Sequence, residues 1–151
     1  MTATPVDVLV VGAGPTGLAL ACQLARFGIR FRIIDKQPDR VRESRALGVQ
    51  ARTLEVLQAL GLGEALAARG RTTTRLMLHV DRDAPVAIDL GAVPRADTRF
   101  PYILFVSQSE TEAALGGYLD AAGVRVERRV ELVGFREESS RVVCILRHMD
   151  G

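Results

Sequence analysis

Near the start of the chain the pattern of hydrophobic positions changes twice within about thirty residues, from that of a strand to that of a helix and back to that of a strand. Residues 8–11 form an unbroken apolar, β-branched run, which predicts a strand buried on both faces. Across residues 15–27 the apolar positions follow helical spacing, and Gly28 stands where a helix commonly ends. A second apolar run, residues 31–34, predicts another strand, and Asp35 follows it directly. The order strand, helix, strand predicts a βαβ unit of an α/β fold with a parallel sheet.

Three glycines, Gly12, Gly14 and Gly17, join the first strand to the first helix at the spacing of a dinucleotide-binding fingerprint. The first makes the tight turn, the second lets a diphosphate approach the backbone, and the third lets helix and strand pack closely. Free N–H groups of the helix N-terminus suit phosphates, and Asp35 can accept hydrogen bonds from a ribose diol while repelling a 2′-phosphate. The alternative is a glycine-rich turn that binds nothing. The strand, helix and acid around the glycines favour the nucleotide site.

Two further helices are predicted downstream. Helical spacing begins near residues 50–52 and ends at Gly61. Ser109 and Glu112 form the pattern of a capping box, which predicts a helix over about residues 110–122.

The remaining apolar runs predict strands. The alternating runs at residues 72–80 and 85–90 predict a β-hairpin or two adjacent antiparallel strands. Either one is an excursion that interrupts the strand–helix alternation of a simple parallel sheet. Shorter extended segments are predicted at residues 102–107, 124–126, 131–136 and 141–147.

Composition describes a globular protein of one-domain size. The chain has 151 residues, of which 48% are hydrophobic and 25% charged, with a formal net charge of +2. This near-balance gives no electrostatic footprint for nucleic acid or an anionic membrane, and no run is apolar enough to span a bilayer. Cys22 and Cys144 fit reduced thiols rather than a disulfide framework or a metal site, which favours a cytoplasmic protein. His79 and His148 have no ligand-like neighbours, so no metal site is expected.

Three stretches of the chain resemble the FAD-dependent aromatic-ring monooxygenases, the para-hydroxybenzoate hydroxylase-like group, and most of all its phenol- and polyketide-hydroxylase branch. They read DVLVVGAGPTGLALACQLARFGI, SRALGVQARTLEVLQALGLGEAL and VSQSETEAALGGYL. The first is shared by many flavin and nicotinamide proteins, whereas the second and third, with their order and separation, are more specific. The resemblance covers nearly the whole chain and implies a Rossmann-like FAD-binding domain.

The resemblance also implies roles for single residues. The three glycines of the fingerprint would approach the FAD pyrophosphate, with Thr16 near it at the helix start. Asp35 takes the place of the acid on the adenosine ribose. Arg45 matches an arginine that contacts the ribose and phosphate region of FAD, and Gln108 matches a glutamine that also contacts FAD. Arg52 takes the place of an arginine that opens the next helix. No catalytic residue is assigned.

The same resemblance implies a discontinuous FAD-binding domain over residues 1–70 and 101–151, with the strands of residues 71–100 belonging to the substrate-domain sheet. Family members are longer, so the chain is expected to be an N-terminal part that is incomplete relative to the family fold and inactive alone. In the family, NAD(P)H reduces the flavin and dioxygen supplies one oxygen atom to an electron-rich aromatic ring. The implied ligands are therefore FAD, transiently bound NAD(P)H and a small aromatic substrate.

Two other hypotheses remain. The chain could belong to a different FAD or NAD oxidoreductase that shares only the fingerprint. Gln108 and the basic segment after Asp35, which holds Arg40, Arg42, Arg45 and Arg52, speak against this alternative. It could also be a nucleotide-binding or self-associating module without activity. Self-association is expected in any case, because the strand at residues 8–11 would present an apolar, uncharged edge without the neighbour that follows later in the family fold.

Overall fold

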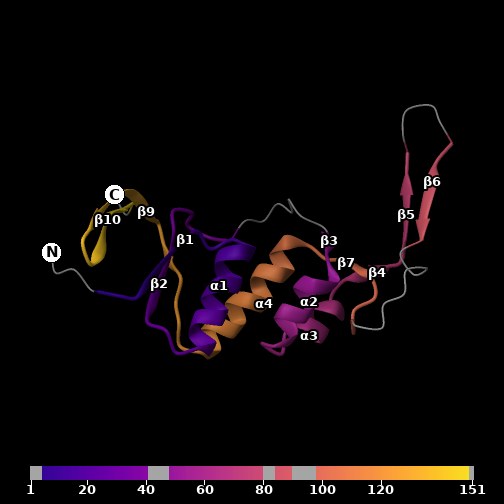
Figure 1. Ribbon diagram of the computed structural model, residues 1–151, viewed down its shortest axis with the longest axis horizontal. Helices are drawn as coiled ribbons and strands as arrows, with labels where there is room; N and C mark the ends of the chain where they lie inside the picture. The colour runs from indigo at the N-terminus through magenta and orange to yellow at the C-terminus, as the bar shows by residue number, and fades with distance from the viewer. Residues whose placement is uncertain (1–4, 41–47, 80–83, 90–97, 150–151) are drawn as a thin grey trace. The chain divides into compact units, whose positions relative to one another are not determined.

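The computed structural model describes residues 5–40, 48–79, 84–89 and 98–149 (Figure 1). The chain divides into two compact units, one formed by residues 1–42 with 115–151 and the other by residues 43–114. Each unit has its own strands and its own buried residues.

The first unit is built on a parallel sheet of three strands. These are β1 (Val8–Val11), β2 (Phe31–Asp35) and β8 (Glu127–Arg128), in the order β1-β2-β8. Helix α1 (Pro15–Arg26) joins β1 to β2. The predicted βαβ unit and its parallel sheet are therefore confirmed.

Small and apolar side chains pack α1 against the part of α4 (Gln108–Ala121) that begins at Leu115. Leu18 and Cys22 of α1 are buried, as are Leu115 and Leu119 of α4. The Cys22 thiol donates a hydrogen bond to the Leu115 carbonyl oxygen at 3.4 Å. Burial raises the pKa of Cys22 to about 11, so this thiol is a core group rather than a reactive one, as the sequence predicted.

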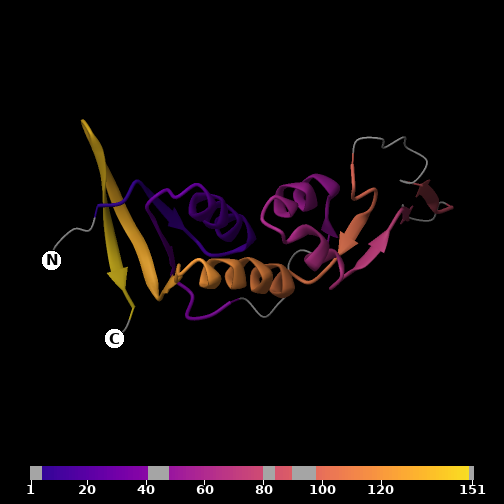
Figure 2. The same cartoon turned by 90° about the horizontal axis from the view of Figure 1, so that it is seen from below.

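A long antiparallel hairpin completes the first unit. It consists of β9 (Val130–Glu138) and β10 (Arg141–His148), which pair along their whole length with an irregularity between Ile145 and Leu146. Figure 2 shows the two strands side by side. The two strands predicted here are confirmed, each one to three residues longer than the apolar pattern indicated.

Among its described residues the second unit holds two short helices, α2 (Ala51–Gln58) and α3 (Gly63–Ala67), the first part of α4, and five short strands. Its core contains Leu54, Leu57, Leu66, Leu104 and Val106. One antiparallel sheet has the order β3-β7-β4, and a separate hairpin pairs β5 with β6. The strands are β3 (Gly48–Val49), β4 (Arg71–Thr73), β5 (Arg75–Leu78), β6 (Val86–Asp89) and β7 (Ile103–Phe105).

The antiparallel excursion is confirmed in β5 and β6, but the run at residues 72–80 is not one strand. Thr73 Oγ1 accepts a hydrogen bond from Arg75 N–H at 3.2 Å and donates to the Arg75 carbonyl oxygen at 2.9 Å. A threonine that bonds the backbone two residues on makes a local turn, which separates β4 from β5. Residues 80 and 90, at the predicted ends of the hairpin strands, lie outside the described residues.

The predicted capping box of α4 is wrong. Ser107 Oγ accepts a hydrogen bond from Glu110 N–H at 3.2 Å, so Ser107 caps the helix two residues earlier than Ser109 would. Glu112 does not reach back to Ser109, because its Oε1 accepts from Gln108 Nε2 at 2.8 Å. The helix accordingly begins at Gln108.

No strand forms at residues 124–126, where one was predicted; β8 begins three residues later, at Glu127. Gly123 has a φ of +75°, and its N–H donates to the Asp120 carbonyl oxygen, while Val124 N–H donates to the Leu119 carbonyl oxygen. These two bonds form a Schellman motif that closes α4. Val124 is therefore used in the helix cap, and pairing with β2 begins only at Glu127.

A charge-assisted pair holds β8 to β2. Both nitrogens Nε and Nη2 of Arg32 donate to the Glu127 carboxylate, at 2.7 and 2.6 Å. These hydrogen bonds hold the pKa of Glu127 below its ordinary value. Both side chains are partly exposed, so solvent screening limits the contribution of the pair to stability.

We expect Glu127→Gln to lower the free energy of unfolding by about 1 kcal/mol at pH 7. Since the folded-state pKa of Glu127 is lowered, its contribution is complete above the unfolded pKa and is lost as the pH falls through the folded value. Urea unfolding at pH 7 and pH 3 measures this: the difference between wild type and variant should shrink at pH 3. The more exposed pair of Asp7 and Arg30 supplies the control, and Asp7→Asn should change the free energy of unfolding less. An equal Glu127→Gln effect at both pH values would contradict the assignment.

Candidate nucleotide-binding site

The turn between β1 and α1 depends on two of its glycines. Gly12 has a φ of +98°, which L side chains rarely adopt, and its N–H donates to the Ile34 carbonyl oxygen at 2.8 Å. A Cβ on Gly17 would overlap the Gly12 carbonyl oxygen, so only glycine lets the first turn of α1 lie against the end of β1. The fold itself therefore requires a glycine at both positions.

Gly14 differs from the other two. Its φ of −78° is ordinary, and a Cβ there would meet nothing within 4 Å. It is the N-cap residue of α1, where the first backbone N–H groups of a helix have no intrahelical partner. The open space above Gly14 thus borders a row of hydrogen-bond donors and the positive end of the helix dipole, which together suit an anionic group. Thr16 is exposed in the same turn.

Asp35 lies beside this turn at the end of β2. Its Oδ2 accepts a hydrogen bond from Ala13 N–H at 2.6 Å, and its Oδ1 accepts one from Gln37 N–H at 2.8 Å. These bonds fix the carboxylate against the glycine turn. Each carboxylate oxygen can accept two hydrogen bonds, so both retain capacity for a hydroxyl donor.

Arg128 is a residue that the sequence analysis did not single out. Its position in β8 is directly opposite Asp35, and its Nη1 lies 3.7 Å from Asp35 Oδ2. The sequence offered only a charged run, Glu127 to Arg129, at the end of an expected strand. Which of those charges faces Asp35 depends on the strand register.

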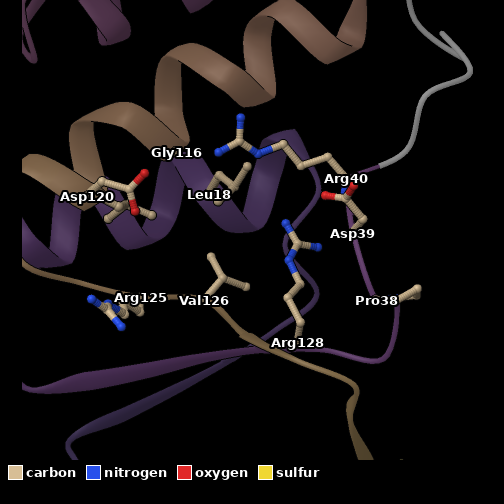
Figure 3. A pocket seen from close by; sticks show the side chains of 10 residues that line it. Leu18, Pro38, Asp39, Arg40, Gly116, Asp120, Arg125, Val126 and Arg128 are labelled. Carbon is tan, nitrogen blue, oxygen red and sulfur yellow. The ribbon is translucent and has the colours of Figure 1, made fainter.

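A cavity of about 300 Å³ opens next to Arg128 in the first unit. Figure 3 shows the side chains of Arg40 and Arg128 directed into it, whereas Arg125 lies at its far side. A Cβ on Gly116 of α4 would come within 2.7 Å of Arg40 Nη2, so the guanidinium lies against a part of the helix that has no side chain. The cavity is lined by Leu18, Pro38, Asp39, Arg40, Gly116, Leu119, Asp120, Arg125, Val126 and Arg128.

The other residues predicted for the site are not all placed with these. The fingerprint glycines, Thr16 and Asp35 come together in the first unit. Gln108 belongs to the second unit, where its amide donates to the buried Glu112 carboxylate. Arg52 forms an exposed ion pair with Glu55 at 2.8 Å along α2. Arg45 lies outside the described residues.

The described part of the chain offers no cluster of His, Cys, Asp and Glu that could hold a metal ion. Nor does any helix within it have the length and apolar character needed to cross a membrane.

Comparison with known proteins identifies relatives over almost the whole chain. A family model described as "FAD binding domain" matches residues 5–151. The 6-methylpretetramide 4-monooxygenase of Streptomyces rimosus is 39% identical over 141 residues, which are 93% of this chain and 25% of that protein.

Solved structures agree. The anhydrotetracycline hydroxylase OxyS of Streptomyces rimosus is 34% identical, with a TM-score of 0.80 over 97% of this chain and 29% of its own. Aklavinone-11 hydroxylase, solved as a ternary complex with FAD and aklavinone, is 26% identical, with a TM-score of 0.80 over 100% of this chain and 31% of its own. The chain thus spans between a quarter and a third of the length of these relatives.

We expect alanine substitutions at two glycines of this turn to have different effects on stability. Gly17→Ala should lower the free energy of unfolding by about 2 kcal/mol or more, because its Cβ overlaps a backbone oxygen that cannot move independently. Gly14→Ala should leave stability within about 0.5 kcal/mol of wild type, since its backbone angles and surroundings both accept a methyl group. Thermal and urea unfolding of the two variants measures the difference. Equal losses in both would mean that the turn is packed differently.

Proposed function

The chain belongs to the FAD binding domain family, and we propose that its glycine turn binds the ADP half of FAD. The observation that carries the proposal is the open space at Gly14, which borders the α1 N-terminus in the same unit as the Asp35 carboxylate. The backbone donors of the turn suit the diphosphate, and the carboxylate suits the ribose diol. Both parts of an adenosine diphosphate therefore have a chemically matched group here.

The proposal assigns further residues to FAD. Thr16 stands next to the diphosphate position, and the resemblance to aromatic-ring monooxygenases adds Arg45 and Gln108 as contacts. The Gln108 amide nitrogen donates to the Glu112 carboxylate at 2.8 Å, and this hydrogen bond helps to orient the Gln108 side chain. The same proposal includes the domain assignment. The FAD-binding domain is discontinuous and consists of residues 1–70 and 101–151, and residues 71–100 belong to a substrate-domain sheet.

For the whole protein we propose an FAD-dependent monooxygenase that hydroxylates an aromatic or polyketide-like substrate in the cytoplasm. The support comes from its relatives, a 6-methylpretetramide 4-monooxygenase and an anhydrotetracycline hydroxylase, and from the aklavinone bound to a structural neighbour. Bound FAD would carry electrons from NAD(P)H and activate dioxygen, while the protein binds, orients and excludes water. These 151 residues correspond to a quarter of the first relative, so we expect them to bind cofactor without hydroxylating.

FAD binding should depend on Gly14 and on Arg45. Gly14→Val places branched carbons where phosphate oxygens would lie and should abolish binding, while Arg45→Ala should weaken it by roughly 1.5–3 kcal/mol if the contact is a charge-assisted hydrogen bond. Quenching of flavin fluorescence in FAD titrations gives the affinities. Gly117→Val is the matched control, because Gly117 also has open space around it but lies on α4.

The visible spectrum of the purified chain separates this proposal from its alternatives. A flavin spectrum would support FAD as the cofactor. If Gly14→Val and Arg45→Ala then left the FAD affinity unchanged, the assignment of these residues to the FAD site would be refuted. A colourless protein that binds NAD would support a different oxidoreductase. A colourless protein that binds neither would support a module without this cofactor.

The chain is also proposed to pair with a second copy through β1. Within the described residues β1 is the outer strand of its sheet, paired on one side with β2, and its Val11 side chain is 53% exposed. β1 consists of Val and Leu alone, without the Lys or Pro that commonly protects an edge strand.

Size-exclusion chromatography with light scattering over a dilution series tests this pairing. We expect wild type to form dimers or larger species at micromolar concentration, and Val11→Lys to shift the population toward monomer because it adds a charge at the edge. Val56→Lys, on the exposed face of α2, is the control and should not shift it. A wild-type monomer with protected amides along residues 8–11 would show that another segment covers this edge.

A further inference from the structure

The ribose-binding carboxylate proposed above is not a solitary charge. Asp35 is held by backbone N–H groups on both of its oxygens and is then faced by the Arg128 guanidinium. Their side chains are 13% and 22% exposed, so the pair lies largely out of water, where charges interact more strongly than at the surface.

The position of Arg128 is set by the sheet rather than by the pair itself. In the β2–β8 register Arg128 is the direct neighbour of Asp35, and the preceding residue, Glu127, is fixed to Arg32 by two short hydrogen bonds. Because β8 is anchored in this way, Arg128 stays beside Asp35 without needing a hydrogen bond to it.

Arg128 Nη1 and Asp35 Oδ2 are 3.7 Å apart, which is too far for a hydrogen bond. Arg128 therefore offsets the charge of the carboxylate without occupying the acceptor sites that a ribose diol needs. Among the described residues no hydrogen bond uses the Arg128 guanidinium, whose donors face the cavity in Figure 3. A diphosphate carries further negative charge to this place, so an uncompensated carboxylate would repel the ligand that it should help to bind.

We propose that Arg128 is a positioning residue for the cofactor: it offsets the Asp35 charge and keeps both carboxylate oxygens available to the adenosine ribose. The proposal rests on the proposed FAD site. If this is correct, the effect of Arg128 on cofactor affinity depends on Asp35. A lysine at position 128 should restore part of that affinity, and replacing another arginine of the same cavity should not change it.

FAD and ADP titrations of the 151-residue chain test it, with ADP as the probe that carries ribose and diphosphate without flavin. Arg128→Gln should weaken both ligands about tenfold, and Arg128→Lys should recover most of that loss. Arg125→Gln is the matched control and should bind like wild type, because Arg125 lines the cavity without pairing with Asp35. In the Asp35→Asn background, Arg128→Gln should add less than about threefold, since the charge that it offsets is gone.

The outcomes are distinct. If the wild-type chain binds neither FAD nor ADP, the proposed function and this inference both fall. If wild type binds but Arg128→Gln binds equally well, or if its loss is undiminished in Asp35→Asn, only the inference falls. Circular dichroism and thermal unfolding of each variant exclude a loss of fold, and failure of the lysine to recover binding would overturn the role of charge.

Discussion

The site depends on the close approach of α1 to the turn that leaves β1. Gly17 lies so near the Gly12 carbonyl that any side chain would collide with it, and this contact places the α1 N-terminus over the end of the sheet. Ala13 N–H is thereby brought to Asp35 across the β1–β2 pair. Packing at one glycine thus aligns the backbone donors and the carboxylate at the same place.

The sequence predicted the parts of the fold that depend on local hydrophobic period. The βαβ unit shows a continuous apolar strand, a helical stripe and a helix-ending Gly28, and each signal is carried by neighbouring residues. The strands β9 and β10 were predicted for the same reason. Among the site residues, Gly12, Gly14, Gly17 and Asp35 could be selected because their spacing itself encodes the turn and the strand that follows.

The sequence could not predict features that depend on which distant backbone groups meet. Ser107 and Ser109 both stand three residues before a glutamate, and only the structure shows that Ser107 caps α4. Thr73 interrupts an alternating run through its own side chain, which apolar spacing does not register. Arg128 was missed because a run of three charges gives no sign of which one faces Asp35. That choice is made by the register of a two-residue strand, β8, against β2.

This short strand separates two uses of charge. Successive side chains of a strand point to opposite faces of the sheet, so Glu127 and Arg128 serve different neighbours. Glu127 faces Arg32 and contributes to holding the strand in place. Arg128 shares a face with Asp35 and the cavity. A shift of one residue would exchange the two, leaving the acid beside Asp35, where like charges repel, and the arginine beside Arg32. The same register therefore maintains the sheet and gives the nucleotide site its balance of charge.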